Sequence, residues 1–256
     1  MQRSTAVTRA ADPPGATPAA TTERSKPPRP APWFVELYRS AVGKKYVMAV
    51  TGVIWMLFIT AHLIGLLKAF FGPEEVNGYG EWLRHVGEPA LHFSWFLWIL
   101  RSSLIVALAL HIHAAYALTV MNHRARPIRY SSDRDYVAAT FASRTMRWSG
   151  VIVALFILYH LMDFTWGNAN PNFVRGDAYG NMIASFERIP VTIAYVIAHL
   201  ALGLHLYHGS WSLFQSLGMN NPRFNKWRWW FSVGFAVAIT VGYLTFPFGV
   251  LTGVFD

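Results

Sequence analysis

Five long apolar stretches dominate the pattern of hydrophobic and polar positions along the chain. They cover roughly residues 46–71, 94–121, 148–167, 189–218 and 229–251, with polar segments between them. A helix needs about 20 apolar residues to cross the hydrocarbon core of a membrane, and each stretch reaches that length. The pattern therefore predicts an all-α integral membrane protein with five transmembrane helices.

The first and third stretches contain the same motif. TGVIWMLFITAH runs from Thr51 to His62 and SGVIVALFILYH runs from Ser149 to His160, so each His follows its Gly by ten residues. Both helices run in the same direction, which places the two His at a similar depth. Ionisable residues in membrane helices are costly, and two His at one depth suit axial ligation of a haem iron. The alternative is a pair of neutral His that form hydrogen bonds between helices.

Helical periodicity places other residues of the motif near the His. At about 100° per residue, the hydroxyls of Thr51 and Ser149 return almost to the face that carries the His. Gly52 and Gly150 lie on an adjoining face, where the missing side chain lets a macrocycle or another helix come close. Ordinary helix packing is the alternative explanation of these glycines.

The second and fourth stretches add further His. His111 and His113 are about 200° apart on a helix and cannot both face one iron, whereas His205 and His208 are about 60° apart, so that either can. His199 points elsewhere and is expected to line the site or contact a helix. Four helices that each carry a buried His predict two bis-His b haems stacked across a four-helix bundle.

The composition limits what this chain can bind by itself. It is 54% hydrophobic and 14% charged, as expected for a membrane protein. It contains no Cys, which excludes disulfides and any iron–sulfur cluster held by this chain alone. It also lacks a Gly-rich dinucleotide fingerprint, so a flavin would have to lie in another subunit.

The charges that flank the spans predict an orientation. Twelve Lys and Arg flank the spans on one side and four on the other, which places the N-terminus in the cytoplasm and the C-terminus outside. Residues 1–32 are rich in Ala, Pro, Thr and Arg, have no signal-peptide core, and predict a disordered cytoplasmic tail. Residues 33–45 are typical of an amphipathic lead-in at the inner membrane surface.

Five motifs, in order, resemble the cytochrome b membrane-anchor subunit of succinate dehydrogenase and fumarate reductase, in its single-chain class with five helices and two haems. They are TGVIWMLFITAHLIG, NGYGEWLRHVG, HIHAAYALTVMNHRARPIRY, YHLMDFTWG and HLYHGSWSLFQSLG. The resemblance covers roughly residues 40–250. It implies a five-helix, di-haem cytochrome b domain over residues 46–256, with one axial His on each of the first four helices.

The resemblance implies four axial ligands, two for each haem b. They are His62 with His160 for the haem nearer the outside, and His111 with His205 for the haem nearer the cytoplasm. Two neighbouring residues stay as alternatives. His113 is the alternative in the second helix, and His208 is the alternative in the fourth.

The resemblance also implies a function in the cell membrane. The chain would be the membrane subunit of succinate dehydrogenase (quinone), in respiratory complex II, and would pass electrons through its haems to menaquinone. FAD and the iron–sulfur clusters would lie in a flavoprotein subunit and an iron–sulfur subunit on the cytoplasmic side. The basic loops NHRARPIRY and NNPRFNKWR are candidates for docking these subunits, although the positive-inside bias alone would also produce them.

Two other functions are compatible with the same spans. A di-haem cytochrome b can serve another membrane oxidoreductase, such as a hydrogenase or a formate dehydrogenase. A membrane anchor or transporter without redox function can use buried His for helix packing or proton relay. The paired His motif favours haem over the second alternative.

Three further ionisable residues belong to the candidate site. Glu81, in the first outer loop, and Asp163, one turn after His160, are candidates for proton exchange with a quinone near the outer haem. A solvated loop carboxylate is the alternative for both. Arg101, ten residues before His111, falls inside a span and is expected to pair with a haem propionate or to snorkel towards the outer surface.

Overall fold

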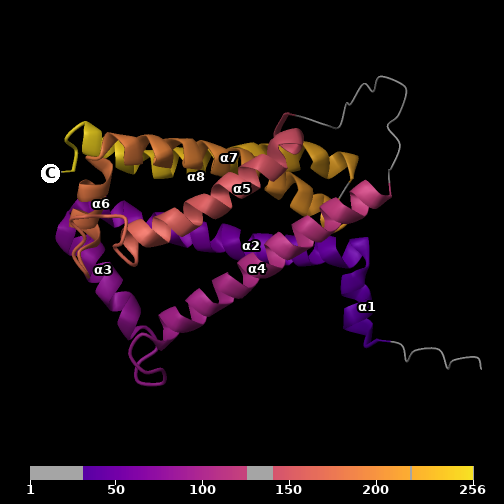
Figure 1. Ribbon diagram of the computed structural model, residues 1–256, viewed down its shortest axis with the longest axis horizontal. Coiled ribbons are helices and arrows are strands. Elements are labelled where there is room, and N and C mark those ends of the chain that lie inside the picture. Colours follow the sequence, from indigo (N-terminus) through magenta and orange to yellow (C-terminus); the bar gives the residue numbers. More distant parts are fainter. Residues whose placement is uncertain (1–30, 126–140, 220, 256) are drawn as a thin grey trace, which may run out of the picture.

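Five helices long and apolar enough to cross a membrane form the body of the molecule (Figure 1). The computed structural model describes residues 31–125, 141–219 and 221–255, so the predicted tail falls almost entirely outside the described residues. The spans are Ala41–Phe71, Trp95–Arg124, Thr145–Phe164, Ile189–Ser216 and Pro222–Leu251. Each overlaps one of the five apolar stretches, and the described residues contain no strand. The prediction of a five-span, all-α membrane protein is confirmed.

Short helices cap the bundle at both ends. The helices in chain order are α1 Trp33–Arg39, α2 Ala41–Leu66, the 3₁₀ helix η1 Leu67–Phe71, α3 Pro73–His85, α4 Trp95–Arg124, α5 Phe141–Phe164, α6 Ala178–Phe186, α7 Ile189–Ser216 and α8 Pro222–Leu251. α1 lies at one end of the long helices, and α3 and α6 lie at the other (Figure 1). We call these the α1 end and the α3 end.

Three long helices, α2, α5 and α8, begin earlier than the apolar stretches that predicted them, and cap residues mark the starts of α2 and α8. α2 begins after Ser40, whose Oγ accepts a hydrogen bond from the amide of Gly43 at 2.9 Å. α8 begins after Asn221, whose side chain accepts from the amide of Arg223 at 2.9 Å. Ser and Asn favour helix starts because their side-chain oxygens satisfy amides that have no partner within the helix. Hydropathy marks the part of a helix that lies in hydrocarbon, whereas the cap residue decides where the helix begins.

A tight corner divides the predicted lead-in, residues 33–45, into α1 and the start of α2. The chain turns at Ser40, which has an extended ψ of 155°. A Cβ atom at Gly43 would overlap the carbonyl oxygen of Leu37, so the close approach of the two helices needs glycine. Lys44 Nζ donates to two carbonyls at the end of α1, at 2.8 and 2.9 Å, and so satisfies groups that the helix leaves open.

The bundle consists of two closely packed helix pairs and a fifth long helix. α2 packs along α4, and α5 packs along α7. α8 packs mainly along α7, as Figure 1 shows, and also contacts α2. Among the described residues, the backbones of α2 and α5 do not pack closely, and neither do those of α4 and α7. A smaller backbone contact between α2 and α7 joins the two helix pairs.

The outward faces of the long helices are apolar. Leu57, Ile105, Leu155, Ile197 and Val237 are among the large hydrophobic side chains that are more than half exposed. An apolar surface of this extent is unfavourable in water but is the expected contact surface for lipid, where the helices satisfy their backbone groups internally. The molecule is a multi-pass membrane protein.

The α1–α2 corner predicts opposite effects for one substitution at two helical glycines. Gly43→Ala should destabilise the fold by about 1–3 kcal/mol, because the new methyl group meets backbone rather than a movable side chain. Gly234 in α8 has open space beside it, so Gly234→Ala should stabilise by up to about 1 kcal/mol through helix propensity. Thermal unfolding in detergent, followed by circular dichroism, measures both effects. Equal unfolding midpoints for the two variants would contradict the need for glycine at the α1–α2 corner.

Candidate functional site

Two pairs of His face each other between the helix pairs. His62 of α2 and His160 of α5 have ring centroids 6.0 Å apart, with ring planes at 75°. We call them the α3-end pair, because both lie close to the ends of their helices at the α3 end. His111 of α4 and His205 of α7 have ring centroids 6.4 Å apart at 56°, and we call them the α1-end pair. The structure brings together the four predicted ligands, in the predicted pairs.

The spacing within each pair suits a metal between the rings. A metal–imidazole bond is about 2 Å long and the ring centre lies about 1 Å further away, so two axial ligands of one metal have centroids roughly 6 Å apart. The observed separations are 6.0 and 6.4 Å. Packed aromatic rings also lie about 4.5–7 Å apart, so the distance does not decide by itself. The hydrogen bonds of the ring nitrogens indicate which nitrogen of each ring is free to bind a metal.

A hydroxyl fixes the tautomer of His111. Thr51 Oγ1 lies 3.0 Å from His111 Nδ1 and donates its own proton to the Val47 carbonyl at 2.7 Å. Because its proton is used in that bond, the hydroxyl can only accept from the ring, and Nδ1 must carry the ring proton. Nε2 is left with a lone pair, which is the form in which neutral imidazole binds a metal.

His205 is held by the second copy of the same motif. Ser149 Oγ lies 3.4 Å from His205 Nδ1, a long contact, and donates to the Met146 carbonyl at 3.0 Å. The proton again belongs on Nδ1, and Nε2 is free. Both rings of the α1-end pair therefore lack a proton on Nε2, and neither can donate a hydrogen bond to the other from that nitrogen.

The glycine of each motif lies against the ring that the preceding hydroxyl holds. A Cβ atom at Gly52 would lie 3.8 Å from His111 Cε1, and one at Gly150 would lie 3.3 Å from His205 Cε1. The motif therefore positions a His of the neighbouring helix, not the His at its own end. Sequence reasoning placed the hydroxyl on the face of its own His, but eleven residues separate them, which is about 16 Å along the helix.

Tyr243 of α8 holds His62. Its hydroxyl lies 3.1 Å from His62 Nδ1 and donates to the Ile59 carbonyl at 2.9 Å. Because its proton is used in that bond, the hydroxyl accepts from the ring, so Nδ1 carries the ring proton and Nε2 is free. Sequence reasoning missed Tyr243, because no feature of the linear pattern relates the fifth span to the first.

Aromatic rings surround His160. Phe156 and Phe164, one turn to either side, lie 5.8 and 5.4 Å from it between ring centroids, and Tyr195 of α7 lies 6.2 Å away. Nδ1 of His160 is buried and has no hydrogen-bond partner among the described residues. His199 is buried nearby, with its ring 5.3 Å from that of Phe156. His199 thus lines the α3-end pair without belonging to it.

The two alternative ligands occupy other positions. His113 stacks on Tyr38 of α1, with ring centroids 5.8 Å apart, and shares a hydrogen bond with its hydroxyl. His208 is only partly buried, about one turn further along α7, and the α7 ring that approaches His111 is that of His205.

Two other predicted residues are exposed. Arg101 lies on α4 with its guanidinium 5.3 Å from the centre of the Trp98 ring, a placement that suits the snorkelling alternative. Pairing of Arg101 with a haem propionate stays a prediction. Glu81 of α3 forms ion pairs with Arg84 at 2.7 Å and His85 at 3.4 Å.

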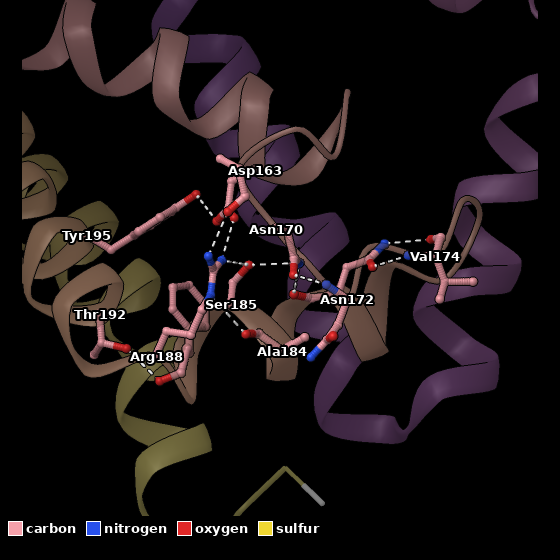
Figure 2. Close-up of polar contacts among 12 residues, drawn as sticks. Asp163, Asn170, Asn172, Val174, Ala184, Ser185, Arg188, Thr192 and Tyr195 are labelled. Carbon is pink, nitrogen blue, oxygen red and sulfur yellow. Dashed lines mark hydrogen bonds and ion pairs between the residues drawn. The ribbon is translucent and has the colours of Figure 1, made fainter.

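Asp163 forms a buried ion pair at the α3 end (Figure 2). Its side chain is fully buried, Oδ1 accepts from Arg188 Nη2 at 2.7 Å, and Oδ2 accepts from the Tyr195 hydroxyl at 3.0 Å. Arg188 also donates to the Ala169 carbonyl at 2.6 Å. Charges buried in a membrane protein are tolerated when they are paired in this way. The ion pair lies one turn from His160.

Side-chain amides fold the connection between α5 and α7 over this ion pair (Figure 2). Asn170 Nδ2 donates to Ser185 Oγ at 3.2 Å, and the Asn181 side chain exchanges two hydrogen bonds with the backbone of Val174, at 2.8 and 2.7 Å. Sequence reasoning missed this network and counted Arg188 only as a loop charge. Its position directly before the start of α7 was the one available signal.

The donor set limits what the His pairs can hold. Among the described residues, no group of three or more His, Cys, Asp or Glu could bind a metal ion. Two imidazoles do not fill the coordination shell of a protein-bound metal, so a metal at either pair needs a ligand that supplies the remaining donors, as a macrocycle does. No family model, curated protein or solved structure matches the chain.

Breaking the buried ion pair from one side should cost more stability than removing it altogether. Arg188→Gln leaves the Asp163 carboxylate unpaired, and we expect a loss of about 3–5 kcal/mol. The double variant with Asp163→Asn should lose less stability than Arg188→Gln alone, because it leaves no unpaired carboxylate. Arg175→Gln, at an exposed position in the same connection, is the control and should change stability by less than about 0.5 kcal/mol.

Thermal unfolding in detergent of the wild type, the two single variants and the double variant measures this coupling, and Arg175→Gln is measured beside them. Strictly additive losses would show that Asp163 and Arg188 contribute independently, against the assignment of a buried pair.

The pKa of His85 should lie above its ordinary value. A hydrogen bond to Glu88 at 3.0 Å is the largest cause that raises the pKa of His85, and Glu81 adds to it. The raised pKa makes the charged pair contribute stability that is fully present below about pH 6.5 and is lost as the pH rises through the folded pKa. An NMR titration should show that Glu88→Gln lowers the pKa more than Glu81→Gln does. A pKa that neither variant changes would contradict this cause.

Proposed function

We propose that this protein is the di-haem cytochrome b membrane anchor of a succinate:quinone oxidoreductase, respiratory complex II. The haem part rests on one observation, the two His pairs at 6.0 and 6.4 Å whose hydroxyl partners leave Nε2 free on three of the four rings. The complex II part rests on the five motifs of the sequence, which together include all four ligand positions.

In this proposal each His pair holds one haem b, which supplies a one-electron carrier when bound. His62 and His160 hold one, and His111 and His205 hold the other. The protein residues around them orient the rings and exclude water. Since Thr51 contacts His111 and lies eleven residues before His62, the two sites are about 16 Å apart along α2. Both therefore fit within a hydrocarbon core about 30 Å thick.

The positive-inside bias supports an orientation with the α1 end in the cytoplasm. Electrons then enter at the α1-end pair from an iron–sulfur subunit, which receives them from a flavoprotein subunit that oxidises succinate. Docking on the basic loops is part of the proposal, although residues 126–140 of the larger loop lie outside the described residues. Arg223 and Lys226, in the first two turns of α8, are exposed.

Menaquinone is the proposed acceptor at the α3-end pair. Its reduction needs protons as well as electrons, and Glu81 and Asp163 are the carboxylates proposed to exchange them. Glu81 is open to solvent, whereas Asp163 is held by Arg188 and the Tyr195 hydroxyl. Glu81 is therefore the simpler proton donor, and Asp163 acts only where its ion pair opens.

Haem content tests the ligand assignment. The purified protein should contain two b haems per chain in a pyridine haemochrome assay. His62→Ala and His160→Ala should each remove the same haem, and His111→Ala and His205→Ala should each remove the other. His113→Ala and His208→Ala are the matched controls and should keep both. An absence of haem, or full retention in a ligand variant, would sink the haem part of the proposal.

The electron donor tests the complex II part separately. Succinate added to membranes should reduce both haems, and malonate, which competes with succinate, should block this reduction. Reduction by formate or hydrogen, with none by succinate, would instead assign the cytochrome to another oxidoreductase.

A further inference from the structure

Tyr243 is the point at which α8 reaches a predicted haem ligand. Its ring lies between two His, with its centroid 6.0 Å from that of His62 and 5.1 Å from that of His199. The Tyr243 and His199 rings are almost parallel, at 11°. The side chain is 8% exposed, so the surrounding residues, rather than lipid, fix its position.

Close contacts fix the depth of α8 next to Tyr243. A Cβ atom at Gly242 would lie 2.6 Å from the Leu63 side chain of α2, and one at Gly203 of α7 would overlap Thr240 Oγ1. α8 is therefore seated against both helices within one turn of Tyr243. A tyrosine held at this depth presents its hydroxyl to a fixed point on α2.

The hydroxyl of Tyr243 bridges two groups of α2. It donates to the Ile59 carbonyl at 2.9 Å and accepts from His62 Nδ1 at 3.1 Å. The α1-end pair receives its hydroxyls from the two copies of the repeated motif, Thr51 and Ser149. Neither copy of the motif supplies a hydroxyl to the α3-end pair, where Tyr243 of α8 holds His62 instead. The two pairs therefore differ in the residues that hold their rings.

We propose that Tyr243 is a positioning residue for the α3-end haem, and that it sets the haem affinity and reduction potential of that site apart from those of the other. The inference rests on the proposed haem function. A hydrogen bond from Nδ1 fixes the ring and makes the imidazole a stronger donor to iron, which favours the oxidised metal. Loss of the hydroxyl should therefore weaken haem binding and raise the potential at this site only.

Tyr243→Phe is the direct test, because it removes the hydroxyl and keeps the ring that stacks on His199. Transfer of one haem to excess apomyoglobin should become about tenfold faster, in line with the effect of other ligand-supporting residues. In a redox titration the midpoint of that haem should rise while the other stays unchanged. His62→Ala identifies which transition belongs to the α3-end pair.

Two matched variants control for the loss of a hydroxyl as such. Thr51→Val removes the hydroxyl that holds His111 and should shift only the other haem. Thr192→Val removes a buried hydroxyl of α7 that donates to the Phe186 carbonyl instead of holding a His, and it should leave both midpoints in place. Unchanged midpoints in Tyr243→Phe, or an equal shift in Thr192→Val, would overturn the proposal.

A measurement without haem separates this inference from the proposed function. NMR of the full chain in detergent, with ¹⁵N-labelled His, should show the proton of His62 on Nδ1, and Tyr243→Phe should mix the two tautomers. Wild-type protein with the proton on Nε2 would overturn the role of Tyr243 even if the variant does not fold. A chain that binds no haem but keeps the Nδ1 tautomer would overturn the haem proposal and leave Tyr243 as the residue that positions His62.

Discussion

Hydrocarbon offers no water to a buried imidazole, and the arrangement of the site depends on this constraint. Each neutral ring carries one N–H and one lone pair, so the nitrogen that the protein satisfies determines the nitrogen that stays free. Thr51, Ser149 and Tyr243 all donate their own protons to backbone carbonyls and can only accept from a ring. In the α1-end pair both free nitrogens then lack a proton. They cannot bond each other, and the proposed haem iron would satisfy both.

The helix packing follows from the same requirement. Two rings can face each other only if each of their helices is fixed by a packed neighbour and the two helices that carry the rings stay apart. α2 packs along α4 and α5 along α7, while the helices that present facing His do not pack closely within the described residues. Gly52 and Gly150 let the ring of each neighbouring helix approach the backbone. Small residues thus let the helices of each pair pack closely, with the ring of one helix against the backbone of the other.

The sequence predicted the spans, because their hydropathy is a local property. It predicted the pairing of His62 with His160 from the repeated motif, and that of His111 with His205 from the resemblance alone. Contacts between helices were harder to predict. Helical periodicity placed Thr51 on the face of His62, but it could not show that a neighbouring helix brings His111 to that depth. Nor could it relate Tyr243 to His62, which lies 181 residues away. Such contacts depend on helix crossings, and one sequence does not contain them.

The buried ion pair shows why the two His pairs are not equivalent despite the repeat. Asp163 lies one turn after His160, and Tyr195 contacts both, through a hydrogen bond to the carboxylate and a ring contact with the imidazole. A fixed carboxylate near one pair favours positive charge there, and Arg188 offsets part of that effect. The first copy of the repeat has no matching acid, because the position that corresponds to Asp163 is Gly65. The repeated motif supplies the paired ligands, whereas the residues outside it, Asp163, Arg188 and Tyr243, give the α3-end pair surroundings of its own.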